Sequence, residues 1–292
     1  MRIGAIEGGG TKFVCAFGDE LGNIYKRVKF PTTTPQETLD KVIEFFLDNP
    51  VDYIGYGTFG PVDLKVSSDK YGYILNTPKK EWINFDVLGY LSNRLDAKIY
   101  IDTDVNLACL GEVYFGSSKS LENVLYITIG TGIGVGVIID GKIIHGVSHG
   151  ELGHILVRRN ANDNYVGKCL YHKDCLEGLA SGPAIEERFG IKGEQLSDNH
   201  EVWNLIGSYL GEACTNYTYV LNPQRIILGG GVGQQPLLLK YTKEHFVKTN
   251  KNYLTNEYVL DIDSYITTVS LKDDAGIKGC LAFAYLKSQN KI

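Results

Sequence analysis

Two stretches of similar pattern decide the fold: IGAIEGGGTKFVCAFG at residues 3–18 and VLYITIGTGIGVGVII at residues 124–139. In each, an apolar strand pattern meets a glycine turn that carries a threonine, and a second apolar strand pattern follows. A third short strand is expected after each pair, across the turns at Leu21-Gly22-Asn23 and Asp140-Gly141. The same order of strands and turns therefore occurs twice, and this internal repeat indicates a duplicated domain.

The repeats stand within an alternation of strand and helix patterns. Thr34, Pro35 and Glu37 form a helix start, and apolar residues at helical spacing continue to Leu47. Further strands are expected over 53–58, 98–102, 142–145 and 225–228, and further helices over 86–95, 105–114, 183–189, 201–221 and 275–286. This alternation predicts an α/β fold with mixed sheets.

The length of 292 residues suggests about two domains. We expect a small α/β domain over residues 1–115, with a C-terminal helix at about 275–292 packing back on it. A larger α/β domain, over residues 116–274, is expected to contain a loop rich in Cys and His.

Composition excludes several classes of protein. The formal charge of −5 leaves no footprint for nucleic acid or an anionic membrane, and no apolar run approaches the ~20 residues of a membrane span. The N-terminus shows no signal-peptide pattern. Four cysteines in apolar surroundings, Cys15, Cys109, Cys214 and Cys280, are expected to be buried thiols, which favours a reducing cytoplasm.

Three glycine turns that follow apolar strands are candidate phosphate sites: Gly8–Thr11, Gly130–Gly134 and Gly229–Gly233. Glycine lets backbone N–H groups approach an anion closely, and Thr11, Thr131 and Lys12 could add donors. A tight hairpin explains any single turn at least as well. Two matched copies and a third favour phosphate binding, although none matches the P-loop or the dinucleotide fingerprint.

Asp104 stands where a strand ends and a helix begins, in Asp102-Thr103-Asp104-Val105-Asn106. The tip of a strand is a favoured place for a catalytic group in α/β folds. An aspartate there could accept the proton of a sugar hydroxyl while its oxygen attacks the γ-phosphoryl group. Asp104 could equally be the N-cap of the following helix, and the two roles are compatible.

The sharpest local pattern is His154-x14-Cys169-x2-His172-x2-Cys175. Two thiolates and two imidazoles suit a tetrahedral zinc site, whereas the alternative is an unrelated set of thiols and histidines. Four protein ligands leave no open position, so we expect one structural zinc per chain and not a zinc hydrolase. Glu151 and Glu177 bracket the loop, either as exposed surface carboxylates or as a pair held rigidly for a sugar.

Together these residues resemble the ROK family of bacterial sugar kinases and repressors, and within it the zinc-containing fructokinases. The resemblance covers nearly the whole chain. It rests on seven motifs: Ile6–Phe13, Phe59–Asp63, Asp102–Asn106, Ile129–Gly134, Glu151–His154, Gly178–Pro183 and Leu228–Val232.

The resemblance implies an actin/hexokinase-like (ribonuclease H-like) duplicated fold, with two domains and ATP–Mg²⁺ in the cleft between them. It implies that Asp104 is the catalytic base and that Glu151, His154 and Glu177 bind sugar hydroxyls, with His154 also on zinc. The ATP-binding residues that it implies are Gly10, Thr11, Lys12, Thr131, Pro183, Gly229, Gly230, Gly231, Val232 and Gly233.

Three departures from the commoner family pattern point away from glucokinase: Glu7 in place of Asp, Thr103 in place of Asn, and His172 in place of a third Cys. They favour D-fructose, converted to fructose 6-phosphate. A mannokinase, a broad-specificity hexokinase and a non-catalytic sugar sensor on the same fold are the alternatives. The departure at Glu7 also leaves its part in the Mg²⁺ site open.

The resemblance also bears on partners. The family's repressors carry an N-terminal helix-turn-helix, and this chain begins directly at the first glycine turn, so no nucleic-acid partner is expected. The expected partners are ATP, a small sugar and, because the family is usually dimeric or larger, a second copy of the chain.

Overall fold

The computed structural model describes residues 1–196 and 198–292. The chain divides into two compact units. The first unit comprises Met1–Ser120, Lys142–Gly150 and Ser270–Ile292, and the second comprises Leu121–Gly141 and Glu151–Val269. Each unit has its own sheet and its own apolar core. The domain boundaries expected from the sequence, 1–115 and 116–274, stay a prediction.

The sheet of the first unit has the strand order β3-β2-β1-β4-β5. Its first part is the antiparallel meander that the sequence predicts, and β4 and β5 add to it in parallel with β1. The strands are β1 (Ile3–Gly8), β2 (Lys12–Gly18), β3 (Ile24–Pro31), β4 (Tyr53–Thr58) and β5 (Lys98–Thr103).

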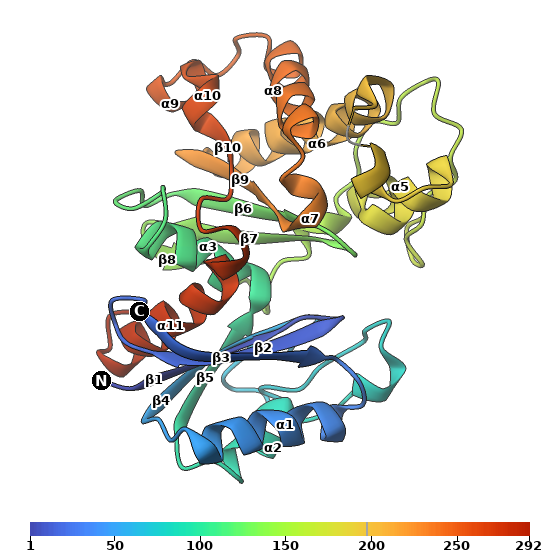
Figure 1. Ribbon diagram of the computed structural model, residues 1–292. Helices are drawn as coiled ribbons and strands as arrows, with labels where there is room; N and C mark the ends of the chain where they lie inside the picture. Colours follow the sequence, from blue (N-terminus) through green and yellow to red (C-terminus); the bar gives the residue numbers. More distant parts are fainter. Residues whose placement is uncertain (197) are drawn as a thin grey trace. The chain divides into compact units, whose positions relative to one another are not determined.

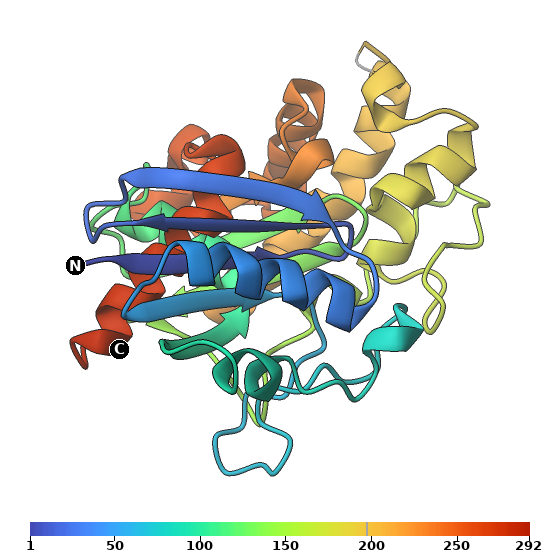
Figure 2. The same cartoon turned by 60° about the horizontal axis from the view of Figure 1, so that its bottom comes forward.

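Helices cover both faces of this sheet (Figure 1), with α1 and α2 on one face and α3 and α11 on the other. They are α1 (Pro35–Asp48), α2 (Val87–Ser92), α3 (Asp104–Tyr114) and α11 (Ala275–Ser288), with short turns η1 (Lys80–Trp82) and η4 (Lys272–Asp274). The Thr34 hydroxyl accepts from the Glu37 amide, which is the predicted cap of α1. Both chain termini lie at the same end of this unit (Figure 2).

Glycines allow α11 to pack directly on its neighbours. A Cβ added at Gly279 would overlap the carbonyl oxygen of Leu107 on α3, and one added at Gly55 would overlap the carbonyl oxygen of Cys280. The C-terminal helix therefore lies against both α3 and β4, which fixes the start of α3 relative to the sheet.

The second sheet has the corresponding order β10-β9-β6-β7-β8, and its strands β6, β7, β9 and β10 lie in the second unit. Here β6 pairs antiparallel with β7 and parallel with β9, and β9 pairs parallel with β10. The strands are β6 (Val124–Ile129), β7 (Ile133–Ile139), β8 (Lys142–Ile143), β9 (Arg225–Gly229) and β10 (Ile266–Thr268). The repeat of the sequence is thus a repeat of sheet topology.

The helices of the second unit come after strands β6 and β7 in the sequence. They are α4 (Leu176–Ala180), α5 (Gly182–Phe189), α6 (His200–Leu221), α7 (Gly230–Gly233), α8 (Pro236–Asn250), α9 (Glu257–Leu260) and α10 (Ile262–Tyr265), with turns η2 (Leu152–His154) and η3 (Gly193–Leu196). Among residues 1–196 and 198–292, no helix combines the length and the apolarity needed to cross a bilayer.

Several predicted boundaries were wrong. The helix predicted over 86–95 is the shorter α2: Asp86 caps its start through the Gly89 amide, and Asn93 is its C-cap. The strand predicted over 142–145 is only β8, since the chain turns at Gly146, whose amide donates to the Ser148 carbonyl. Helix α8 was not predicted at all.

Candidate active site

The first glycine turn joins β1 to β2 and is closed by the Gly9 amide donating to the Lys12 carbonyl at 2.9 Å. Thr32, at the end of the meander, supports it from outside: its hydroxyl donates to the Gly9 carbonyl at 2.7 Å and its amide to the Thr11 carbonyl at 3.0 Å. Thr11 and Lys12 are exposed. The turn is therefore braced while its donor side chains face solvent.

Lys79 lies beside this turn and was not among the predicted site residues. Its Cε would be 3.7 Å from a Cβ added at Gly10. Lys79 and Lys12 thus provide two cations at the same glycine turn, where phosphate oxygens would benefit from both. The signal in the sequence was Thr77-Pro78-Lys79-Lys80, which carries no spacing that points to the distant turn.

Asp104 is the first residue of α3 and follows directly on β5. The N-cap is Thr103, whose hydroxyl accepts from the Asn106 amide, so the alternative that Asp104 itself caps the helix was wrong. The Asp104 Oδ1 atom accepts from the Val105 amide at 2.9 Å, and the residue is half-buried. Gly57 of β4 lets the helix start approach closely, with 3.2 Å between its added Cβ and the Asp104 Cα.

The buried carboxylate of Asp102 organises this corner. Its Oδ1 accepts from the Thr103 amide and the Asn106 side chain, each at 2.7 Å, and its Oδ2 lies 2.9 Å from Nε2 of His145. The hydrogen bond to Asp102 raises the pKa of His145. Sequence reasoning missed His145 because a lone histidine far along the chain gives no sign of its partner.

The Phe59–Asp63 motif is held by a second histidine that the sequence did not single out. His149 accepts from the Val62 amide through Nε2 at 3.0 Å, and the neighbouring Ser148 hydroxyl donates to the Val62 carbonyl at 3.2 Å. The segment Lys142–Gly150 therefore fixes both this motif and, through His145, the corner at Asp102.

Glu7 lies within β1, near the start of α11. A Cβ added at Gly276 would lie 2.6 Å from its carboxyl carbon. Burial raises the pKa of Glu7, while the nearby charges of Lys12 and Arg27 act in the opposite direction. The carboxyl group is thus partly buried beside the first glycine turn.

The second glycine turn joins β6 to β7, and three backbone or carboxylate contacts hold it. The Gly130 amide donates to the Gly132 carbonyl at 2.9 Å, and the Gly182 amide donates to the Gly130 carbonyl at 2.7 Å. The Ile133 amide donates to Oε2 of Glu177 at 3.0 Å. Thr131, at the tip of the turn, is exposed.

The third glycine turn is helical: β9 ends at Gly229 and α7 begins at Gly230, whose φ is 77°. A Cβ added at Gly230 would overlap the Ile129 carbonyl oxygen, and one added at Gly182 would lie 3.6 Å from Val232. Pro183 occupies the first turn of α5, next to Gly182. The second turn, the start of α5 and the segment Gly229–Gly233 are therefore neighbours within the second unit.

The four predicted metal ligands come together. Their ligand atoms all lie within 4.8 Å of one another, with His154 Nδ1 at 3.4 Å from Cys175 Sγ and 3.7 Å from Cys169 Sγ. His172 Nδ1 also lies 3.7 Å from Cys169 Sγ. Tetrahedral zinc, with bonds of about 2.0–2.3 Å, spaces its ligand atoms by roughly 3.3–3.8 Å, so these residues fit such an ion.

The chemistry of the donor set points the same way. Cys169 and Cys175 are buried, and burial raises the pKa of the Cys175 thiol to about 12. A cation that replaces the thiol protons would remove this penalty, because it neutralises the thiolates. All six cysteines are described, and each is a buried free thiol, including the four that the sequence predicted to be buried.

The two predicted sugar-binding carboxylates differ in exposure. Glu177 is half-buried, and its Oε1 lies 3.9 Å from Nε2 of His154. Glu151 is exposed, and its carbonyl accepts from the His154 amide at 3.0 Å. Both therefore flank the same histidine, one through its side chain and one through its backbone.

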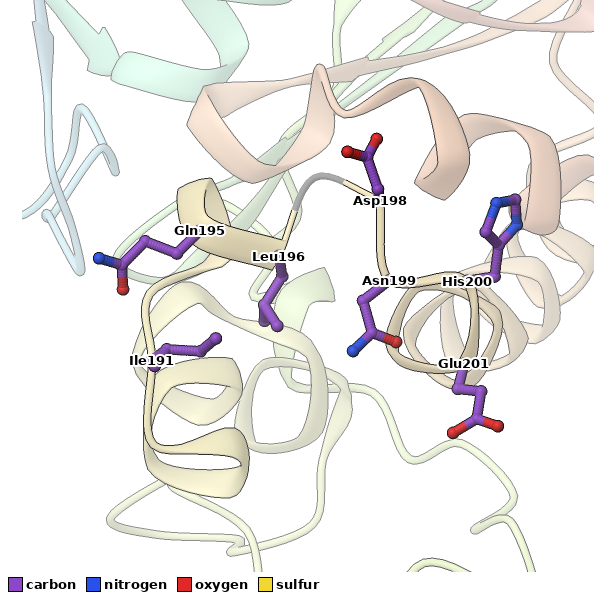
Figure 3. Close-up of a pocket in the computed structure, with 7 residues that line it drawn as sticks. All are labelled: Ile191, Gln195, Leu196, Asp198, Asn199, His200 and Glu201. Carbon is purple, nitrogen blue, oxygen red and sulfur yellow. The ribbon is translucent and has the colours of Figure 1, made fainter.

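A separate pocket lies at the start of α6 (Figure 3). It has a volume of about 470 Å³ and is lined by Ile191, Gln195, Leu196, Asp198, Asn199, His200 and Glu201. None of the predicted site residues contributes to it, and its lining offers no cluster of cations for phosphate. We do not assign the site to it.

The duplicated sheets and the glycine turns define an α/β protein of the actin/hexokinase-like fold, as the solved structures confirm. A ROK family glucokinase from Streptomyces griseus, solved in complex with glucose and AMPPNP, superposes with a TM-score of 0.78 at 23% identity. The similarity covers 98% of this chain and 99% of that one.

The particular family follows from the sequence comparisons. The model of the ROK family matches residues 3–287, and the chain therefore belongs to this family. A fructokinase of Pediococcus pentosaceus is 43% identical over 290 residues, which is 99% of this chain and 100% of the relative. A fructokinase of Lactococcus lactis subsp. cremoris is 43% identical over 275 residues, covering 94% and 93% respectively.

Proposed function

We propose that this chain is an ATP-dependent fructokinase that converts D-fructose to fructose 6-phosphate. The observation that carries the proposal is the 43% identity to a fructokinase along 99% of the chain. The candidate site supports it, because each glycine turn that could hold phosphate and the aspartate that could act as base are present in ordered surroundings.

In this reaction Asp104 is the general base. Its carboxylate takes the proton from the attacking sugar hydroxyl, the oxygen forms a bond to the γ-phosphorus, and ADP leaves with the electrons of the broken P–O bond. The Val105 amide orients one carboxylate oxygen, and the Thr103 cap fixes the helix on which the carboxylate stands. The sugar itself is bound by Glu151, His154 and Glu177.

The nucleotide is held by the glycine turns. Backbone N–H groups around Gly10 and Thr131, together with the side chains of Thr11 and Lys12, bind its phosphates, and we add Lys79 to this set. Pro183 and the segment Gly229–Gly233 bind the adenosine side, consistent with their closeness within the second unit. Mg²⁺ arrives with ATP as part of the substrate, and no role in its binding is assigned to Glu7.

His154, Cys169, His172 and Cys175 would hold one structural zinc ion. Bound there, the ion supplies charge neutralisation for two buried thiolates and fixes the loop between them. The loop that carries these four ligands in turn orients His154 and Glu177 toward the sugar. We further propose a homodimer, and a reducing cytoplasm as the location, which fits the finding that none of the six described cysteines forms a disulfide.

The test is ADP release measured with a coupled assay, with and without fructose, followed by conversion of the product by an isomerase specific for fructose 6-phosphate. We expect ADP release that depends on fructose and a product that the isomerase consumes. A protein that binds fructose without releasing ADP is the sugar sensor, and one that phosphorylates fructose at another carbon contradicts the 6-phosphate assignment.

A further inference from the structure

The metal-ligand loop contacts the second glycine turn from both of its ends. The loop runs from Gly153 and His154 to Cys175 and Glu177, and both ends meet Ile133, the first residue after the turn. This contact is separate from the sugar-binding role given to Glu177 above. It raises the question of what the loop does for the nucleotide.

The first contact is a charge-assisted hydrogen bond. Oε2 of the half-buried Glu177 accepts from the Ile133 amide at 3.0 Å. Gly132 also lies against this carboxylate, since an added Cβ there would be 2.7 Å from Oε2. A hydrogen bond from a backbone amide to a partly buried carboxylate is stronger than one between neutral groups. This contact therefore restricts the conformation of the turn.

The second contact comes from the opposite end of the loop. Gly153 packs so closely on β7 that an added Cβ would overlap the Ile133 carbonyl oxygen. The next residue, His154, directs Nδ1 toward the two cysteine sulfurs and has Nε2 3.9 Å from Oε1 of Glu177. Two residues next to the metal ligands therefore contact the backbone of Ile133: Glu177 accepts from its amide, and Gly153 packs against its carbonyl.

We propose that Glu177 is a positioning residue for the second phosphate-binding turn, and that the metal loop thereby sets the affinity for nucleotide in the absence of sugar. The inference rests on the proposed function, in which the turn Gly130-Thr131-Gly132 binds phosphate. A turn that is not held by Glu177 samples other conformations, and ordering it on binding costs free energy that appears as weaker affinity.

The test uses the zinc-bound protein and compares three substitutions. Glu177→Met keeps the length of the side chain but removes the acceptor, and Glu177→Gln keeps one acceptor oxygen for the Ile133 amide. Glu187→Gln is the control, because it removes the same charge from α5 at an exposed carboxylate that pairs with Lys168 and does not touch the turn.

The readout is the Kd for Mg-ADP, measured by calorimetry without sugar. Loss of this charged hydrogen bond leaves the turn less ordered before binding, so we expect Glu177→Met to raise the Kd by roughly 5–20-fold, which corresponds to about 1–2 kcal/mol. The Kd of Glu177→Gln for Mg-ADP should remain within about threefold of that of the unmodified protein, and the Kd of the Glu187→Gln control should equal that of the unmodified protein. A Glu177→Met protein that retains zinc and binds Mg-ADP with unchanged Kd overturns the proposal.

A second readout does not depend on any ligand. Hydrogen exchange of the peptide covering residues 130–136 should be faster in Glu177→Met than in the control, because the Ile133 amide loses its partner. Removal of zinc from the unmodified protein should accelerate the same peptide. Unchanged exchange in both preparations contradicts the proposal even if the kinase assignment holds, whereas faster exchange with no Mg-ADP binding by the unmodified protein contradicts the kinase assignment alone.

Discussion

The two glycine hairpins come from one repeated motif, yet they are held by different means. The first is supported by Thr32, which follows directly on its own meander. The second is supported by Glu177, Gly153 and Gly182, which belong to the region inserted between β8 and β9. In the first unit the corresponding place between β3 and β4 holds only α1.

This difference shows how two copies of one repeated hairpin can come to depend on different parts of the chain for their order. The first hairpin is fixed by local hydrogen bonds and should not respond to metal. The second is fixed by residues that flank a cluster of four metal ligands, so its order should depend on the ion. Changes in each unit therefore have separable consequences.

The largest effect is expected at the catalytic corner of the first unit. Asp104→Asn should lower kcat by about 10²–10⁴-fold, because the amide cannot accept the hydroxyl proton. Zinc content should stay unchanged, since the four metal ligands belong to the other unit. The affinity for Mg-ADP should also stay unchanged, since Asp104 acts on the sugar hydroxyl and is not one of the nucleotide-binding residues. Steady-state kinetics and calorimetry check this, and a kcat within about threefold of the unmodified enzyme removes Asp104 from the mechanism.

Loss of the metal should disturb the second hairpin and the sugar ligands of the same loop, and should leave the first hairpin unchanged. Cys175→Ser should abolish the content of about one zinc per chain, as measured by elemental analysis, and activity should fall with it. Hydrogen exchange should accelerate around residues 130–133 and remain unchanged around residues 9–12. A metal-free preparation that is fully active would show that the cluster is not structural.

Ion pairs offer a matched comparison of stability between the units. Arg188 and Asp163 form a buried pair at 3.0 Å, with side-chain exposures of 7% and 4%, whereas Arg27 and Asp274 are each 37% exposed. Arg188→Met should destabilise the second unit by about 3–5 kcal/mol, because it leaves the Asp163 charge buried. Arg27→Met should cost about 0–1 kcal/mol, and thermal melts should reproduce this order.

The smallest effect concerns His145, whose pKa is raised by its hydrogen bond to Asp102 while burial and Lys287 on α11 oppose the rise. A histidine with a raised folded-state pKa stabilises fully below its ordinary pKa of about 6.5, and this contribution is lost as the pH rises through the folded-state pKa. The melting temperature of the unmodified protein should therefore exceed that of His145→Gln most at low pH. The pair should contribute at most about 1 kcal/mol to the free energy of unfolding. A difference in melting temperature that stays constant across pH contradicts a stabilising pair between His145 and Asp102.

Much of the fold was predictable, because strands such as β4 and β6 carry continuous apolar patterns between clear breakers. The metal cluster was predictable because its ligands are close in sequence. The bonds from Glu177 to Ile133 and from Asp102 to His145 were not, since they join distant segments and depend on packing. Helix α8 escaped prediction because the glycine-rich segment before it hides its start, which Gln235 caps.

The central claim is that this chain phosphorylates fructose in preference to other hexoses. The most direct test is kcat/KM for fructose, mannose and glucose measured side by side with the same preparation. A site that hydrogen-bonds each hydroxyl can discriminate by 10⁴-fold or more, because a misplaced hydroxyl leaves a buried partner unpaired. We predict the highest kcat/KM for fructose. A value for glucose that equals or exceeds it would contradict the fructokinase assignment.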